Sequence, residues 1–281
     1  MLDVSPHIAP QQRVHGRAAV VIGSDGRIAD LHQSGAAKAM LPRMHGRPPE
    51  VVFLNTAGGV TGGDRLSYAL EVAAGATVVG TTQTAERAYR SSAGTGRIET
   101  RLTVGAGATL AWLPQEVIVF EGARLDRVLE ADLDATARLI TCETLVLGRR
   151  AMGEHLRDIG LTDRRRVRRA GRVIGHEAIG LDASALAPEA AAGLGTATAL
   201  ATVCLFASDA PDHLDRVQAA LPAGAAKGPA TGLPGLRAAA SAWDGRLVVR
   251  LMGPDAHDLR RALARIVTTL TAADLPRVWQ T

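Results

Sequence analysis

The sequence predicts a mainly β protein whose strands are layered in a β-helical, solenoid-like stack, followed by a C-terminal α+β part that carries two helices. Three observations support this fold class. The 281 residues are 47% hydrophobic but only 3% aromatic, so the core must be built largely from Val, Leu and Ile, residues that suit strands. Glycine (30 residues) outnumbers proline (13 residues), as expected for strands joined by tight turns. A strand–turn–strand pattern also recurs along the first two thirds of the chain.

The recurring pattern is an apolar strand end, a short turn, and an Ala-Thr pair that opens the next strand. It occurs at residues 70–78, 102–110 and 129–137, with the Ala-Thr pairs beginning at Ala76, Ala108 and Ala135. A loose repeat of about 30 residues made of strands and turns is typical of stacked β-layers. Gly-Ala turns can also recur by chance in an alanine-rich chain, and that alternative stays open.

The last third changes character and predicts two strands and two helices. Residues 198–206 form a β-like run, after which Asp209 is expected to cap a first helix that has a proline in its first turn and an apolar face of Leu214, Val217 and Leu221. Residues 246–251 form the clearest strand. A second helix follows residues 253–255, with an apolar stripe at helical spacing: Leu259, Leu263, Ile266, Val267 and Leu270.

The helices need a sheet to cover, so the sequence predicts one domain over residues 1–281, with a β-rich body over about 1–195 and an α+β part over about 196–281. The N-terminus lacks a basic segment followed by an apolar stretch, and no run of about 18 apolar residues exists. Cys142 and Cys204 are too far apart to form a CxxC pair. These features predict a cytoplasmic, reduced protein.

The formal net charge is +4, and one basic run is dense, at residues 164–169. No aromatic residues that could stack on bases are interleaved with it. A solvated strand edge or a protein-docking patch is therefore favoured over a nucleic-acid site, because charge runs are usually solvated.

The glycine-rich segment 58–64, which ends in Asp64, is the most unusual local sequence. Three interpretations are open: a phosphate-binding loop, a loop that presents the Asp64 carboxylate, and a plain tight turn between strands. A Walker loop would end in Gly-Lys-Ser/Thr, whereas this one ends in an acid that would repel phosphate. The sequence therefore predicts that the protein is not itself an NTPase.

Three further segments carry polar residues in unusual places. Residues 81–92 are rich in hydroxyls and arginine and would be expensive to bury without hydrogen bonds. Residues 112–120 combine a turn at Pro114 with a strand. Residues 142–155 place Glu143 at one end of an apolar strand and Glu154 beyond the other end, where an ion pair between Arg149 and Glu154 closing a turn is the alternative to a functional role.

Familiar catalytic templates are missing from the sequence. There is no G-x-S-x-G or H-E-x-x-H motif, and the eight histidines never lie at the spacing of a ligand pair. Pairs of carboxylates can still form in three dimensions, so acid–base chemistry stays open.

Taken in order, these segments resemble the urease accessory protein D family (UreD, called UreH in some bacteria). The matching stretches are residues 58–64, residues 85–92 around Tyr89-Arg90-Ser91, residues 112–116, Gly148-Arg149 with Gly153-Glu154, and the closing residues 275–279. The match covers most of the chain. Arg87 stands where the family more often has lysine, and the arginine run 164–169 is not a family feature.

The resemblance implies a non-enzymatic chaperone, with a β-helical body and two helices, that helps to install nickel in urease. Such proteins bridge apo-urease to accessory protein F, which recruits the GTPase, accessory protein G, while accessory protein E supplies nickel. The family is thought to pass nickel through an internal, water-filled tunnel. It implies no tightly bound cofactor and no tight metal site, only Ni²⁺ in transit.

By the same resemblance, Asp64 and Glu143 match acidic positions on the nickel path, and Glu154 is a neighbour of that path. The remaining family-motif residues are Gly58, Gly59, Gly62, Gly63, Tyr89, Arg90, Gln115 and Arg149. Two alternatives from other classes remain: a β-solenoid hydrolase or lyase using paired carboxylates such as Asp64, Glu116 and Glu143, and a purely structural partner-binding module.

Overall fold

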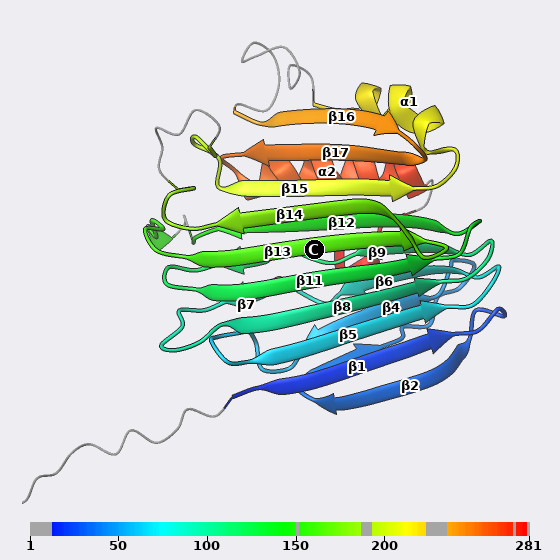
Figure 1. Ribbon diagram of the computed structural model, residues 1–281, viewed down its shortest axis with the longest axis horizontal. Helices are drawn as coiled ribbons and strands as arrows, with labels where there is room; N and C mark the ends of the chain where they lie inside the picture. The colour runs from blue at the N-terminus through cyan, green and yellow to red at the C-terminus, as the bar shows by residue number, and fades with distance from the viewer. Residues whose placement is uncertain (1–12, 150–151, 187–192, 223–234, 272–273, 280–281) are drawn as a thin grey trace, which may run out of the picture.

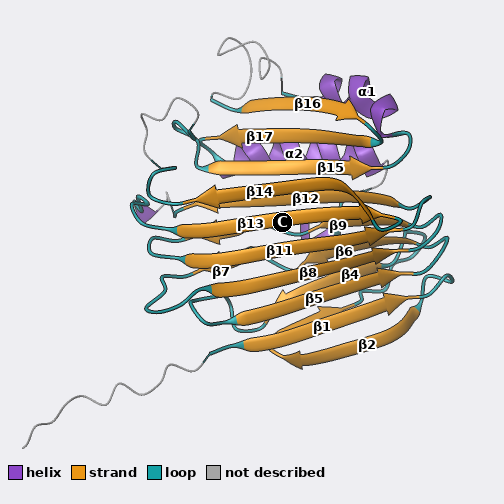
Figure 2. Cartoon of the chain, viewed as in Figure 1, coloured by secondary structure: helices purple, strands orange, loops and turns teal. Residues whose placement is uncertain are grey.

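Two β-sheets stack face to face, and helices cover the outer side of one of them (Figure 1). The computed structural model describes residues 13–149, 152–186, 193–222, 235–271 and 274–279. Strands dominate and helices gather at the C-terminal end (Figure 2). The predicted fold class, a mainly β, solenoid-like stack with two C-terminal helices, is confirmed.

The seven-strand sheet has the order β14-β13-β11-β8-β5-β1-β2. Its central strands run parallel, while β2 and β14 are antiparallel strands at its two edges. The strands are β1 (His15–Ile22), β2 (Ile28–Gly35), β5 (Arg65–Val72), β8 (Gly96–Val104), β11 (Arg124–Leu133), β13 (Gly160–Arg169) and β14 (Arg172–Leu181).

The ten-strand sheet has the order β16-β17-β15-β12-β9-β6-β4-β3, with β10 and β7 beside it. Its C-terminal strands β15, β17 and β16 add to the edge of β12 in antiparallel fashion. The strands are β3 (Ala37–Met40), β4 (Glu50–Asn55), β6 (Thr77–Thr82), β7 (Glu86–Ala88), β9 (Thr109–Leu113), β10 (Val117–Val119), β12 (Arg138–Leu147), β15 (Ala199–Phe206), β16 (Arg237–Trp243) and β17 (Arg246–Gly253).

The chain alternates between the sheets, so that each coil contributes one strand to each of them. Tight turns 73–76, 105–108 and 134–137 join the sheets at one edge, on the right of Figure 1, and longer loops return at the other. Each turn is closed by the same backbone bond, from the fourth residue's N–H to the first residue's carbonyl, at 3.1 to 3.2 Å. The predicted repeat is therefore the solenoid coil.

The third repeat has a different register from the one that the sequence predicts. Arg138 pairs with Thr109, and Thr109 pairs with Thr77, so Ala137 rather than Ala135 occupies the place of Ala108. The prediction was wrong by two residues because the third turn uses different chemistry. The Thr136 backbone N–H donates to the Asp134 carboxylate at 3.2 Å, and the Thr136 hydroxyl accepts from the Gly107 N–H at 2.9 Å.

Two apolar layers join the seven-strand sheet, the ten-strand sheet and the helices into one structure. The first lies between the sheets, where Phe53 contacts the rings of Tyr68 and Trp112 at centroid distances of 5.3 and 5.8 Å. The second lies between the ten-strand sheet and helix α2 (Ala256–Thr271). Every residue of the predicted stripe of α2 is buried, which confirms that helix and its apolar face.

The first predicted helix is shorter and begins differently. A 3-10 helix η2 (Ala210–His213) precedes α1 (Leu214–Ala220), and a further 3-10 helix η3 (Arg277–Trp279) ends the described chain. As predicted, the N-cap residue of η2 is Asp209. Its carboxylate makes no capping bond and instead contacts Arg138 at 2.6 Å and His213 at 3.0 Å. None of the described helices is long and apolar enough to cross a membrane.

Candidate functional site

The glycine-rich loop 58–64 interlocks with the segment that carries Tyr89 and Ser91. The N–H of Val60 donates to the Arg87 carbonyl at 2.7 Å, and the N–H of Tyr89 donates to the Val60 carbonyl at 2.8 Å. A Cβ atom on Gly62 would lie 2.0 Å from the Ser91 hydroxyl oxygen. A side chain there would collide with the neighbouring segment, so glycine permits the close approach. The first two motif segments thus form one packed unit.

The buried Asp64 side chain stabilises this loop through hydrogen bonds to backbone N–H groups. Its side chain is only 3% exposed, and its two carboxylate oxygens accept from the backbone N–H groups of Val14 and Thr61, each at 2.8 Å. A carboxylate is well suited to this task because a charged acceptor strengthens both bonds. Among the interpretations of the glycine segment, these contacts favour the tight turn.

Tyr89, Arg149 and Glu154 meet at the same loop edge around Phe120. The Tyr89 ring packs edge-on against Phe120 at 5.1 Å, and the Arg149 guanidinium lies 4.3 Å from the centre of that ring. Glu154 accepts two bonds from the Arg149 side chain, each at 3.1 Å, so the predicted ion pair is confirmed. The hydrogen bond from Arg149 lowers the pKa of Glu154.

Arg90 belongs to the same edge. Its backbone pairs with Ala123, and its side chain lies against Gly122, whose added Cβ would come within 2.9 Å of it. Tyr89 remains 41% exposed. Gly58, Gly59, Gly62, Gly63, Tyr89, Arg90 and Arg149, seven of the eight family-motif residues, therefore lie in loops that return at one edge of the solenoid.

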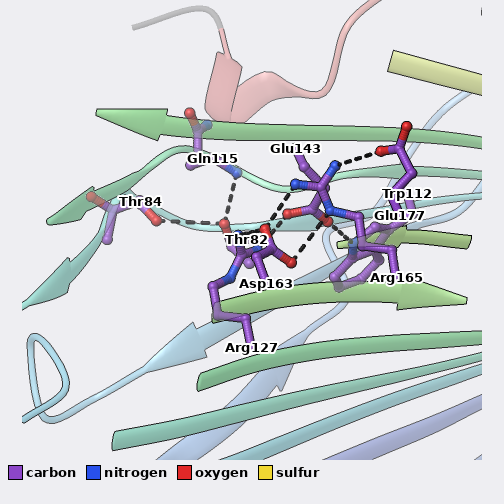
Figure 3. Close-up of polar contacts among 9 residues, drawn as sticks. All are labelled: Thr82, Thr84, Trp112, Gln115, Arg127, Glu143, Asp163, Arg165 and Glu177. Carbon is purple, nitrogen blue, oxygen red and sulfur yellow. Dashed lines mark hydrogen bonds and ion pairs between the residues drawn. The ribbon is translucent and has the colours of Figure 1, made fainter. Parts of the chain in front are cut away.

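Glu143 lies elsewhere, in a buried network of charges between the two sheets (Figure 3). It accepts from the Trp112 indole N–H at 3.3 Å and from the Arg127 guanidinium. Arg127 also binds Asp163 at 2.9 Å, and Asp163 binds Arg165 at 2.7 Å. Alternation along β11, β12 and β13 turns these side chains toward the space between the sheets.

The network continues toward the C-terminal strands. Arg165 contacts Glu177 of β14 at 3.4 Å, and Glu177 contacts Arg250 of β17 at 2.6 Å. Burial raises the pKa of Asp163, but the charges of Arg127 and Arg165 outweigh burial and leave that pKa below its ordinary value. Buried charges persist only when paired and hydrogen-bonded, and here two carboxylates match two guanidiniums. Glu143 is thus held in place by its neighbours.

Glu86 extends this polar interior, and the sequence did not single it out. It accepts from the Asn55 amide at 3.3 Å, and the same amide donates to the Gly59 carbonyl at 3.0 Å. Burial raises the pKa of Glu86, against the effects of Asn55 and of the Arg127 charge. The sequence did indicate that burying the polar segment 81–92 costs free energy unless its groups are hydrogen-bonded. That indication did not identify Glu86 as the buried acid.

Gln115 marks a third location, where the closing motif meets α2. Its amide donates to the Val278 carbonyl at 2.7 Å, and its carbonyl oxygen accepts from Arg260 of α2 at 2.6 Å. The Trp279 indole N–H donates to the Leu113 carbonyl at 3.0 Å. The two motifs therefore anchor the C-terminal segment to the ten-strand sheet.

The arginine run 164–169 forms most of β13, and its members point to alternate sides. On the outer face, Arg164 binds Asp126 at 3.0 Å, and Arg166 binds Glu130. Arg165 instead points inward to the buried network. The run therefore lies in an interior strand, paired with β11 on one side and β14 on the other, so the predicted strand edge was wrong. Its outer arginines pair with the acids of β11.

The donors expected of a tight metal site do not come together in the described part of the chain. No group of three or more His, Cys, Asp or Glu side chains is placed there to hold a metal ion. Cys142 and Cys204 are both free and buried, and burial raises the pKa of the Cys204 thiol to about 12. A thiol with so high a pKa is neither a ready nucleophile nor a ready ligand at neutral pH.

Comparison with known proteins agrees with these motifs along almost the whole chain. A family model described as UreD urease accessory protein matches residues 14–280. The urease accessory protein UreD of Jannaschia sp. (strain CCS1) is 55% identical over 280 residues, which cover 100% of both chains. That of Dinoroseobacter shibae is 52% identical over 96% of this chain and 93% of its own, and that of Paracoccus denitrificans is 48% identical over 97% and 95%. The chain therefore belongs to the UreD family of urease accessory proteins.

Proposed function

We propose that this protein is a non-catalytic scaffold in urease maturation, which bridges apo-urease to accessory proteins F and G and helps to pass nickel to the urease active site. Accessory protein E supplies the nickel, the cytoplasm is the place of action, and Ni²⁺ is cargo in transit. The observation that carries the proposal is the full-length relationship to urease accessory proteins.

The polar interior between the sheets supports the conduit part of the proposal. Charged and polar side chains run from Glu86 through Arg127, Glu143 and Asp163 to Glu177, inside an otherwise apolar sandwich. Nickel binds strongly to nitrogen, oxygen and sulfur donors, so a protein that releases nickel onward must avoid a clustered site. Separated carboxylates attract a cation and still let it leave, as in pores.

The contacts of the acids determine how the conduit is tested. Asp64 accepts two backbone N–H groups, and Glu143 faces an arginine, so truncation to alanine would disturb the fold as well as any nickel path. The isosteric variants Asp64→Asn, Glu143→Gln and Glu154→Gln remove the charge and keep the shape, and each loses one of the two accepting oxygens to an NH2 donor. Asp158→Asn, at an exposed ion pair with Arg124, is the matched control.

Each variant is co-expressed with urease and the accessory proteins, and two quantities are measured on the same sample: complex formation by gel filtration and nickel content by elemental analysis. We expect Glu143→Gln to lower nickel content and urease activity while the complex with accessory protein F persists and the control stays normal. Normal nickel loading in Asp64→Asn/Glu143→Gln would remove these acids from the path. Loss of the complex would assign them a structural role.

The hydrolase or lyase alternative gains no support from the geometry. Its candidate acids have separate partners: Asp64 binds the backbone of Val14 and Thr61, Glu116 pairs with Arg260 of α2 at 3.0 Å, and Glu143 faces Arg127 of β11. Glycoside-type chemistry needs two carboxyl groups flanking one bond. The structure does not assemble such a pair from these three residues.

A further inference from the structure

A cavity of about 260 Å³ opens where the seven-strand sheet ends and the ten-strand sheet continues. β14, the last strand of the shorter sheet, and β15 and β17 of the longer sheet contribute most of its lining residues. This cavity lies outside the family-motif loops. Its lining also includes Leu129 of β11, Arg165 and Val167 of β13, and Trp243 at the end of β16.

The cavity combines apolar walls with cationic groups. Leu129, Val167, Phe206 and Val248 provide apolar surface, and Arg165, Arg246 and Arg250 provide the charge. A Cβ on Gly175 would lie 2.7 Å from the Phe206 ring, so this glycine lets the ring pack against β14. An apolar pocket with a few convergent polar groups is the usual form of a small-molecule site.

The charges inside the cavity do not balance. Arg165 and Arg250 both contact Glu177, and Arg165 also binds Asp163 behind it, so these two cations have carboxylate partners. Arg246 differs: its guanidinium stacks on Trp243 at 4.2 Å, and one Nη donates to the Ile174 carbonyl at 3.0 Å. Its Nε atom is buried without a hydrogen-bond partner within the described ranges.

Arg246 lines the cavity, lies over the Trp243 ring and has no carboxylate partner among the described residues, so its guanidinium is available to an oxyanion. Guanidinium groups bind carboxylates through parallel hydrogen bonds, and leaving a buried donor unpaired is costly. We propose that this cavity is a binding site for a carboxylate that carries a small apolar body, with the carboxylate on Arg246 and the body against Val248 and Phe206. The carboxylate comes from a free organic acid or from an acidic side chain of a partner protein.

The test uses the full-length protein and the probe pair benzoate and benzamide, which share a shape but differ in charge. Binding is measured by isothermal titration calorimetry, and its location by fluorescence of Trp243, which is 40% exposed, whereas Trp112 and Trp279 are buried. We expect benzoate to bind and to change the Trp243 signal. We expect benzamide to bind at least about tenfold more weakly, because it cannot form the charged bond.

Variants locate the site, and the wild-type probe pair keeps the proposal testable if a variant fails to fold. Arg246→Gln is expected to weaken benzoate binding at least about tenfold, and the matched control is Arg261→Gln, an exposed arginine on α2. Equal binding of benzoate and benzamide, or equal losses in both variants, would overturn the proposal.

The source of the carboxylate is distinguished by competition. N-acetyl-glutamate amide presents a side-chain carboxylate as a protein partner would. Displacement of benzoate by this compound assigns the site to a partner's acidic side chain, and failure to displace assigns it to a free acid. The inference does not depend on nickel transfer, so the two proposals fail separately.

Discussion

Gly62 lies where two motif loops cross, and oxygen atoms of the neighbouring segment occupy the place that a Cβ would take. An added Cβ would lie 2.4 Å from the Ala93 carbonyl oxygen and 2.6 Å from that of Gly94, in addition to the Ser91 hydroxyl. Backbone atoms cannot swing aside as a flexible side chain can. The residue is therefore constrained by packing, whatever the loop contributes to partner binding.

Gly62→Ala is expected to lower the free energy of unfolding by about 1–3 kcal/mol, the usual cost of overpacking. The measurement is urea-induced unfolding. Gly180→Ala is the matched control, since its Cβ would meet nothing within 4 Å and its φ is ordinary. It should change stability by no more than about 0.5 kcal/mol. Equal effects of the two substitutions would mean that the loops separate readily.

Glu86 gives a residue-scale prediction about pH. Burial raises its pKa in the folded state, so the folded protein favours the neutral acid. Below the unfolded-state pKa, about 4.3, both states are protonated and the acid costs nothing. As pH rises above that value the unfolded state ionises first, and stability falls until the folded-state pKa is passed.

Glu86→Gln should therefore stabilise the protein at about pH 7 and have little effect on charge-linked stability at about pH 4. Glu154→Gln is the opposite control. Arg149 lowers the pKa of Glu154, so its charge stabilises the folded state above about pH 4.3, and removing that charge should destabilise the protein at neutral pH. Urea unfolding at both pH values checks the signs, and the same sign for both substitutions would contradict the assignment.

At the level of elements, α2 is the clearest case of sequence predicting structure. Its apolar stripe at a 3.6-residue period leaves only one face that can be buried, and that face covers the ten-strand sheet. The third solenoid turn was misaligned because Asp134 and Thr136 replace the Gly-Ala chemistry of the first two turns. A side-chain hydrogen bond of this kind carries no periodic signal.

Leu263→Ala tests whether this stripe is core or partner surface. Leu263 is 2% exposed, so the substitution should cost about 2–5 kcal/mol by leaving a cavity against the sheet. Arg261→Ala, on the exposed side of the same helix, is the control. Thermal unfolding and binding to accessory protein F are measured together. Full stability combined with loss of the partner would make the stripe an interface.

At the scale of the whole molecule, the buried network shows why the interior could not be predicted. Glu143 and Asp163 are 16 and 36 residues from Arg127 and meet it only because successive coils stack in register. The sequence singled out Asp64, Glu143 and Glu154 but neither Asp163 nor Glu86, and the ordered motifs indicated the family. Which arginine faces which acid depends on the coil length, which no short pattern specifies.

The open end of the solenoid is the other whole-molecule feature. Every residue of edge strand β2 is exposed, including Ile28 at 48% and Leu31 at 39%. In the described part of the chain, β2 pairs only with β1, so its outer side offers unpaired backbone groups. A long exposed edge that carries apolar side chains promotes association with other strands. The isolated protein is therefore expected to self-associate through this edge.

Leu31→Lys should reduce that self-association without lowering stability, because lysine on an edge opposes strand addition. Light scattering during gel filtration measures the change, and urea unfolding checks the fold. Thr103→Lys is the control: it adds the same charge on the same sheet, but on β8, which is paired on both sides. If both lysines reduce association equally, net charge is the cause and the β2 edge is not. If only Leu31→Lys does so, the open end of the solenoid is the surface that makes the isolated scaffold self-associate.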